Sequence, residues 1–177
     1  MENRKGIIIY RSKYGATEKY AGWISEETGF EMVRADDFNW DSLEGYDVII
    51  YGGGIYAAGI AGIKELKKRA DKLKKKRMAV FAVGASPYDD KAFSDMYSHN
   101  FKGVLEGIKC FYFRGAWDEE KMTVRDRTLC RLLQKSLRKK PENEREPWEA
   151  ALMEAAGKKK DWSDRYEAMD LIEYVRS

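Results

Sequence analysis

Short apolar runs alternate with helical patterns along most of this chain. Five runs are expected to be strands, at residues 6–10, 31–35, 47–51, 78–83 and 109–114. Strands that alternate with helices predict a parallel sheet. Continuous apolar runs such as Val48-Ile49-Ile50-Tyr51 suit a sheet that is buried on both faces. We therefore expect an α/β fold in which helices cover both faces of a doubly wound, five-stranded parallel sheet.

Helical spacing of apolar residues predicts helices at residues 16–29, 60–73 and 119–137. Residues 87–107 are interpreted as an insertion of weak helical character near the carboxyl ends of the strands. A polar joint then precedes a short helix, in which Pro147 suits the first position. The last helix is expected to start with Asp161 as its N-cap. Its expected buried residues are Trp162, Tyr166, Met169 and Ile172.

The composition fits one domain of ordinary size. The 177 residues are enough to bury a core without disulfide or metal support, so we expect a single domain over residues 1–177. Charged residues make up 36% of the chain and nearly balance, leaving a net charge of +3. The densest basic run, at residues 64–77, has no interleaved aromatic residues, so it is interpreted as a solvated helix face and no nucleic-acid partner is expected.

Cysteine usage and hydropathy indicate a cytoplasmic location. Cys110 and Cys130 lie in apolar-patterned segments and form no C-x-x-C pair, and we identify no leader before the first strand. No uncharged apolar stretch approaches the roughly 18 residues of a membrane span. His99 is the single histidine, which excludes a multi-histidine metal site, and no metal site is expected.

The first expected strand is followed by Arg11-Ser12-Lys13-Tyr14-Gly15-Ala16-Thr17 and then by a helical pattern. A turn at the mouth of a helix presents unpaired N–H groups and the positive end of the helix dipole, and Ser12 and Thr17 add hydroxyl donors. The loop therefore favours a bound phosphate, although taken alone it also fits an ordinary turn with a helix cap. Its spacing matches neither G-x-x-x-x-G-K-[ST] nor G-x-G-x-x-G.

Glycines follow the third expected strand, in the run Gly52-Gly53-Gly54-Ile55-Tyr56-Ala57-Ala58-Gly59. We expect a loop there whose glycines adopt positive φ and approach a flat ligand closely, with Tyr56 covering a ring. The run also satisfies the dinucleotide pattern G-x-G-x-x-A. That pattern wants an acidic residue about 20 positions further on, and residues 72–77 hold none, which disfavours the dinucleotide alternative.

Small residues end the fourth expected strand, in the run Val83-Gly84-Ala85-Ser86-Pro87-Tyr88. Alone, this run fits a plain turn. In a doubly wound sheet of strand order 2-1-3-4-5, however, the loops after strands one, three and four converge at the carboxyl edge. Glycine and hydroxyl residues at three adjacent strand ends therefore predict a ligand site.

The sequence resembles the flavodoxin-domain family over nearly its whole length, and more narrowly it is similar to the menaquinone-dependent, flavodoxin-like protoporphyrinogen oxidases. The narrower resemblance rests on Tyr10-Arg11-Ser12-Lys13-Tyr14-Gly15-Ala16-Thr17, on Gly52 to Ala57 before a helix, on Phe113-Arg114-Gly115-Ala116 leading into Arg125-Asp126-Arg127, and on Asp161-Trp162. It implies a flavodoxin-like sheet of order 2-1-3-4-5 and FMN as the cofactor.

The resemblance also implies which residues bind FMN. Its phosphate would be held by Ser12, Lys13, Tyr14, Gly15, Ala16 and Thr17. Its isoalloxazine would lie between two segments, Gly53, Gly54, Ile55, Tyr56, Ala57 and Val83, Gly84, Ala85, Ser86. Flavodoxins tune the flavin through a backbone group after the third strand, and the glycines permit such a peptide change. Because electron transfer is then the chemistry of the flavin, no catalytic acid or base is predicted.

Two features depart from the electron-carrier flavodoxins. Tyr14 stands where a small hydroxyl residue is usual, so the phosphate contact there would be made by backbone alone. Carrier flavodoxins are acidic, whereas this chain has a net charge of +3, which favours an oxidase-like or peripheral membrane role. We expect an oxidoreductase that exchanges electrons with a redox partner protein or a quinone, and the narrower resemblance implies a porphyrinogen as substrate. The alternatives are a non-catalytic flavodoxin-type carrier and a flavin-free interaction module.

Residues 122–140 form a basic amphipathic pattern. Four leucines share this segment with seven arginines and lysines. A helix of this kind can lie on anionic lipid, so peripheral membrane contact through residues 122–140 is one hypothesis. The alternative is a core-packed helix with a charged outer face.

Overall fold

The computed structural model describes residues 4–177, and it confirms the doubly wound sheet. The five parallel strands are β1 (Gly6–Arg11), β2 (Glu31–Arg34), β3 (Val48–Tyr56), β5 (Arg77–Gly84) and β6 (Lys109–Arg114). Their order across the sheet is β2-β1-β3-β5-β6, which is the expected 2-1-3-4-5 order. The segments that follow β1, β3 and β5 therefore lie at one edge of the sheet.

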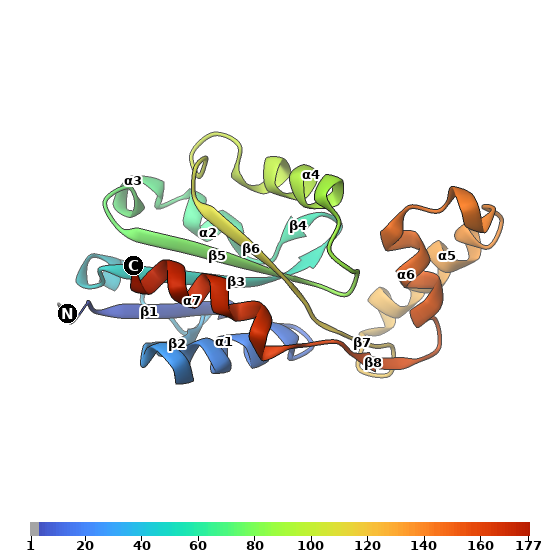
Figure 1. Cartoon of the computed structure of the whole chain (residues 1–177), viewed down its shortest axis with the longest axis horizontal. Coiled ribbons are helices and arrows are strands. Elements are labelled where there is room, and N and C mark those ends of the chain that lie inside the picture. Colours follow the sequence, from blue (N-terminus) through green and yellow to red (C-terminus); the bar gives the residue numbers. More distant parts are fainter. Residues whose placement is uncertain (1–3) are drawn as a thin grey trace.

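Each face of the sheet belongs to a separate core, because successive side chains of a strand point to opposite faces. Ile7 and Ile9 of β1 pack with buried residues of α2 (Ile63–Lys67), α3 (Ala70–Leu73) and α4 (Asp90–Phe101). Ile8 and Tyr10 pack with buried residues of α1 (Ala16–Thr28) and α7 (Met169–Arg176). Figure 1 shows the resulting layers, with the sheet between the two sets of helices.

The segment after β3 differs from the expected loop and long helix. β3 continues through Tyr56, and the chain turns back as β4 (Gly59–Ile60), which pairs with β3 in antiparallel fashion. The helix expected at residues 60–73 is therefore two short helices, α2 and α3. Gly62, with φ of 77°, lets the chain pass from β4 into α2.

The weak helical pattern of residues 87–107 predicted an insertion near the carboxyl ends of the strands, and the structure shows that this prediction is wrong. These residues contain α4, the crossover helix between β5 and β6, which Asp89 caps by accepting a hydrogen bond from Ala92 N at 2.8 Å. Met96, Phe101 and Leu105 are buried against the same face of the sheet as α2 and α3. The many polar residues of α4 obscure its helical period in the sequence.

The C-terminal segment differs from the prediction that Asp161 caps the last helix. Asp161 ends a short strand, β8 (Lys159–Asp161), which pairs in antiparallel fashion with β7 (Ala116–Asp118). The cap is instead Asp164, at the start of η3 (Arg165–Ala168), which leads into α7. Ile172 is buried as expected, whereas Tyr166 is 82% exposed.

Residues 116–161, from the start of β7 to the end of β8, form a lobe of their own. It contains α5 (Val124–Leu137), η2 (Glu142–Glu144) and α6 (Pro147–Ala155), in which Pro147 takes the expected first position. We call it the α5–α6 lobe. Figure 1 shows it projecting beyond the carboxyl ends of the parallel strands. Within residues 4–177, no helix is both long and apolar enough to cross a bilayer.

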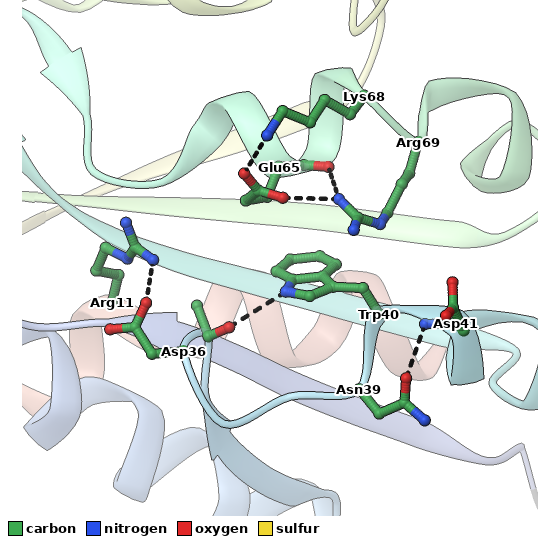
Figure 2. A network of polar contacts seen from close by, with 9 residues as sticks. Arg11, Asp36, Asn39, Trp40, Asp41, Glu65, Lys68 and Arg69 are labelled. Carbon is green, nitrogen blue, oxygen red and sulfur yellow. Dashed lines mark hydrogen bonds and ion pairs between the residues drawn. The ribbon is translucent and has the colours of Figure 1, made fainter.

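A polar network links the β1–β2 edge of the sheet to α2 and α3 through η1 (Trp40–Gly45). The guanidinium of Arg69 lies 4.8 Å from the centre of the Trp40 ring and pairs with Glu65 at 2.8 Å. Arg11, the last residue of β1, pairs with Asp36 just after β2 (Figure 2). These contacts hold the end of β1, from which the first of the three converging segments starts.

Candidate functional site

The loop between β1 and α1 presents free backbone donors at the start of a helix of 13 residues. Gly15 is the N-cap, with φ of 98°, and no side chain among the described residues caps this helix. The first bond within the helix runs from Lys19 N to Gly15 O at 3.0 Å, so the N–H groups of Ala16, Thr17 and Glu18 precede it. Together with the positive end of the helix dipole, these donors form an anion site.

The two hydroxyl residues of this loop, Ser12 and Thr17, differ in their surroundings. Ser12 Oγ accepts a hydrogen bond from Gly15 N at 3.1 Å, and its own hydroxyl proton remains free to donate. Thr17 is 3% exposed in the first turn of α1, so packing restricts its side chain. Ser12 and Thr17 therefore both lie at the N-terminal end of α1, where the sequence predicts a phosphate loop.

Lys13 and Tyr14 do not extend freely into solvent, because both contact Asp126 of α5. Lys13 Nζ and the Tyr14 hydroxyl donate to the same carboxylate oxygen, and Thr123 N donates to the Tyr14 hydroxyl at 3.3 Å. The hydrogen bond from Lys13 lowers the pKa of Asp126, and the same bond raises the pKa of Lys13. Sequence reasoning missed Asp126 as a site residue, because nothing local marks a partner 112 positions after Tyr14.

The glycines after the expected third strand lie inside β3, and the loop with positive φ that the sequence predicts there is not formed. None of Gly52, Gly53 and Gly54 has a positive φ. A Cβ on Gly52 would lie 2.0 Å from Cζ of Phe81, and a Cβ on Gly53 would lie 2.7 Å from the carbonyl oxygen of Ala61. These glycines are required because neighbouring groups pack directly against their Cα atoms.

The positive φ angles fall instead on Ala57 and Ala58, at 47° and 64°. These residues form the turn between β3 and β4, and two left-handed residues give the turn whose twist suits a tight hairpin. Each left-handed alanine costs about 1 to 2 kcal/mol. The hairpin therefore stores strain next to the predicted binding segment.

Asn100 of α4 holds this hairpin in place. The side chain is 2% exposed, and its Oδ1 accepts a hydrogen bond from Ile60 N at 2.9 Å. Its Nδ2 donates to the carbonyl oxygens of Ala58 and Met96, both at 2.7 Å. Because all of these bonds are buried or partly buried, they offset the strain of the turn. A lone asparagine within a polar helix gave no sequence signal of this role.

The third segment, at Val83 to Ser86, is held through its carbonyl groups. Gly84 O accepts from Gly115 N at 2.8 Å, and Ala85 O accepts from Arg114 Nε at 3.1 Å. Ser86 O accepts from the hydroxyl of Tyr112, and burial raises the pKa of that hydroxyl to about 12, so it remains a donor at neutral pH. β6 thereby fixes the backbone of this segment beside β3.

Sheet register places the three segments side by side. Arg11 at the end of β1 is the partner of Gly53, and Gly54 is the partner of Val83. Two tyrosines stand at this edge, since Tyr56 is 41% exposed and Tyr88 is 57% exposed. Desolvation raises the pKa of the Tyr56 hydroxyl to about 12, and Lys13 Nζ lies 5.8 Å from the centre of the Tyr56 ring.

His99 lines a cavity of about 300 Å³ between β4, α2 and α4, together with Lys64, Lys67 and Arg11 at the end of β1. No cluster of three or more His, Cys, Asp or Glu residues within 4–177 is arranged to hold a metal ion. The three converging segments differ from this cavity in the groups that they present to a ligand. They combine an uncapped helix N-terminus with close-packed backbone and exposed aromatic rings, an arrangement that suits a flat ring carrying a phosphate group.

Comparison with known sequences gives two matches. A family model described as a flavodoxin domain matches residues 7–144. An uncharacterized protein of Methanocaldococcus jannaschii is 32% identical over 87 residues, which are 48% of this chain and 57% of that protein. The match therefore spans little more than half the length of this curated relative.

Solved structures with a similar fold include three flavoproteins. A WrbA-like flavodoxin of Agrobacterium tumefaciens has a TM-score of 0.49 at 20% identity, covering 70% of this chain and 88% of that one. The flavodoxin of Megasphaera elsdenii has a TM-score of 0.44 at 22% identity, covering 60% and 82%. A Lactobacillus acidophilus flavoprotein in complex with FMN has a TM-score of 0.40 at 20% identity, covering 63% and 93%.

Proposed function

Because this chain belongs to the flavodoxin-domain family, which matches residues 7–144, we propose that it binds FMN and acts as a flavodoxin-like oxidoreductase. The observation that carries this proposal is the sheet register. It sets the uncapped N-terminus of α1 beside the ends of β3 and β5, so that a phosphate site and two backbone segments share one edge.

The residues at this edge fit FMN. The N–H groups of Ala16, Thr17 and Glu18 and the hydroxyl of Ser12 would bind the phosphate. The flavin ring would lie between Gly53 to Ala57 and Val83 to Ser86, with the Tyr56 ring available to cover it. When bound, FMN supplies the electron-transfer chemistry. The protein binds and orients it, and Asn100 keeps the hairpin that borders the ring in one position.

The finer proposal is oxidation of a porphyrinogen with a quinone or a redox protein as electron acceptor. It rests on the motif resemblance and on a net charge of +3, which an acidic carrier of the flavodoxin type would not have. The second candidate is a non-catalytic electron carrier, for which the same FMN site would suffice. A fold by itself does not separate these two activities.

Absorption spectroscopy of the purified protein tests the first half of this proposal. We expect a flavin spectrum, or its appearance when FMN is added, with quenching of flavin fluorescence on titration. A colourless protein that takes up no FMN would contradict both flavin functions and leave an interaction module.

Anaerobic mixing of the FMN-loaded protein with a porphyrinogen tests the second half. Bleaching of the flavin band by porphyrinogen, followed by its return on addition of menaquinone, is expected of an oxidase. FMN binding without reduction by porphyrinogen would instead support the carrier.

A further inference from the structure

The α5–α6 lobe carries most of the large apolar side chains that the fold leaves exposed. Five of the nine lie on it, and they are Val124, Leu129, Leu132, Leu133 and Trp148. The other four are scattered over the rest of the described chain. An exposed apolar patch of this kind on a polar background marks an interaction surface.

Three of these residues form one strip along α5. Leu129, Leu132 and Leu133 follow the i, i+3, i+4 spacing that places side chains on the same side of a helix, and they are 55%, 60% and 40% exposed. Gln134 and Leu137 are buried and mark the packed side of α5, which adjoins the strip because Leu137 is four residues after Leu133. The three exposed leucines therefore extend the apolar surface of α5 beyond the part that packs within the lobe.

Cations of α5 border this strip, and α5 carries no unpaired acid. Helical spacing places Arg125, four residues before Leu129, and Lys135, three residues after Leu132, beside the leucines, and Lys139 follows just after the end of α5. None of these three cations forms an ion pair with any residue of 4–177. Asp126 is the single acidic residue of α5, and its carboxylate is bound by Lys13 and Tyr14. The outer side of α5 is thus apolar and cationic at once.

We propose that the outer side of α5 docks this protein on an anionic phospholipid surface. The leucine strip enters the boundary between headgroups and acyl chains, while Arg125, Lys135 and Lys139 contact lipid phosphates. Charge complementarity favours this occupant, because a symmetric contact with a second copy would bring two basic faces together. The alternative occupant is an acidic protein partner, and an absence of binding to anionic vesicles would leave that occupant.

The docked helix also lies next to the candidate site. Asp126 joins α5 to Lys13 and Tyr14, so the converging loops are held beside the lipid-facing helix. Taken with the proposed redox function, this arrangement gives a lipid-soluble electron acceptor a short path to the site. Lipid docking itself requires no flavin and is tested separately.

Co-sedimentation of the full chain with vesicles tests this proposal. Two vesicle types are compared, phosphatidylcholine alone and phosphatidylcholine mixed with phosphatidylglycerol. We expect binding to the anionic vesicles only, weakened by added salt as the charges are screened. The variants Leu132→Ser and Lys135→Gln/Lys139→Gln are each expected to bind at least about tenfold more weakly.

Matched controls lie elsewhere on the surface. Val104 is 60% exposed, as is Leu132, so Val104→Ser removes an equally exposed apolar side chain outside the lobe. Lys75→Gln/Lys109→Gln removes two exposed charges outside the lobe. Both controls should bind vesicles as the wild type does, and circular dichroism should show all variants folded.

Three results would overturn the proposal. The first is an absence of binding to anionic vesicles, and the second is equal loss of binding in the lobe variants and their controls. The third is self-association in sedimentation velocity that Leu132→Ser abolishes, which would assign the strip to a second copy. Vesicle binding by protein that takes up no FMN would support docking while contradicting the redox function.

Discussion

Tyr14 donates a hydrogen bond to the carboxylate of Asp126, although the two residues are 112 positions apart. Lys13 pairs with the same carboxylate, so α5 is fastened to the loop that is proposed to bind the FMN phosphate. This contact stabilises the position of the lobe. It also brings a carboxylate to the loop that leads into the free N–H groups of α1, where its charge would oppose a bound phosphate.

Asp126→Asn is expected to strengthen FMN binding, because it removes this repulsion and releases the ammonium of Lys13. For a partly exposed ion pair the gain is about 1 kcal/mol, or roughly fivefold in Kd, measured by quenching of flavin fluorescence. Asp95→Asn is the matched control, since Asp95 pairs with Lys91 at 3.0 Å on α4. Unchanged or weaker FMN binding in Asp126→Asn would contradict this electrostatic account.

Acid is expected to release the same contact. The hydrogen bond from Lys13 lowers the pKa of Asp126 below its ordinary value of 3.8. The contact therefore contributes fully above that ordinary value and is lost as the pH falls through the lowered pKa. The protection factor of the Thr123 amide, which corrects hydrogen exchange for its intrinsic pH dependence, should fall in this acidic range and stay constant around neutrality.

Thr17→Ala is expected to weaken FMN binding by roughly 1 kcal/mol, because a hydroxyl donor to the phosphate is lost. Thr17→Ser keeps the hydroxyl and should bind FMN nearly as the wild type does. Since Thr17 is 3% exposed, the thermal stability of both variants must be recorded as well. Equal FMN affinity in all three proteins would remove Thr17 from the phosphate site.

Asn100→Ala is expected to destabilise the protein by about 2 to 3 kcal/mol, because Ile60 N and the carbonyl of Ala58 lose a buried partner. The loosened hairpin should also bind FMN more weakly. Urea denaturation measures the first effect, and fluorescence titration measures the second. Asn143→Ala, at an exposed position of η2, is the control and should change neither.

Gly52→Ala and Gly22→Ala should have opposite effects. A Cβ on Gly52 would clash with the ring of Phe81 at 2.0 Å, and we expect a loss of about 2 kcal/mol or more in the free energy of unfolding. A Cβ on Gly22, within α1, would meet nothing within 4 Å. Because alanine favours helix, Gly22→Ala should stabilise the protein by about 0.5 to 1 kcal/mol in urea denaturation.

Cys110 is expected to be unreactive in the folded protein. Burial raises the pKa of its thiol to about 12, so it stays protonated and non-nucleophilic far above neutral pH. In a Cys130→Ser background, alkylation by iodoacetamide at about pH 8 should be at least a hundredfold slower than in guanidinium chloride. Rapid alkylation of the native protein would place Cys110 in an accessible, redox-competent environment.

The local sequence pattern predicted an element correctly where residues adjacent in the chain determine its conformation. The strand at Lys109–Arg114 and the helix from Ala16 were both predicted at their observed starts, because a continuous apolar run and a glycine turn mark them in the sequence. Pro147 at the head of α6 is a second such case, since its fixed φ suits that position whatever surrounds it.

The errors occur where a distant segment decides instead. The pairing of Ile55 with Ile60 keeps Gly53 to Tyr56 in a strand and moves the positive φ angles to two alanines. The pairing of β7 with β8 likewise takes Asp161 from the predicted helix cap. In both cases backbone hydrogen bonds between strands outweigh a local preference for a loop or a cap.

By itself, the sequence determined the order of strands and helices, because this follows from apolar periodicity. Its resemblance to the flavodoxin-domain family implied the sheet order and hence which three segments meet at the edge. Only the tertiary structure decided that Asp126 faces the phosphate loop, that Asn100 fixes the hairpin, and that the leucines of α5 are exposed. Each of these depends on contacts between residues far apart in the chain, and the local sequence does not predict such contacts.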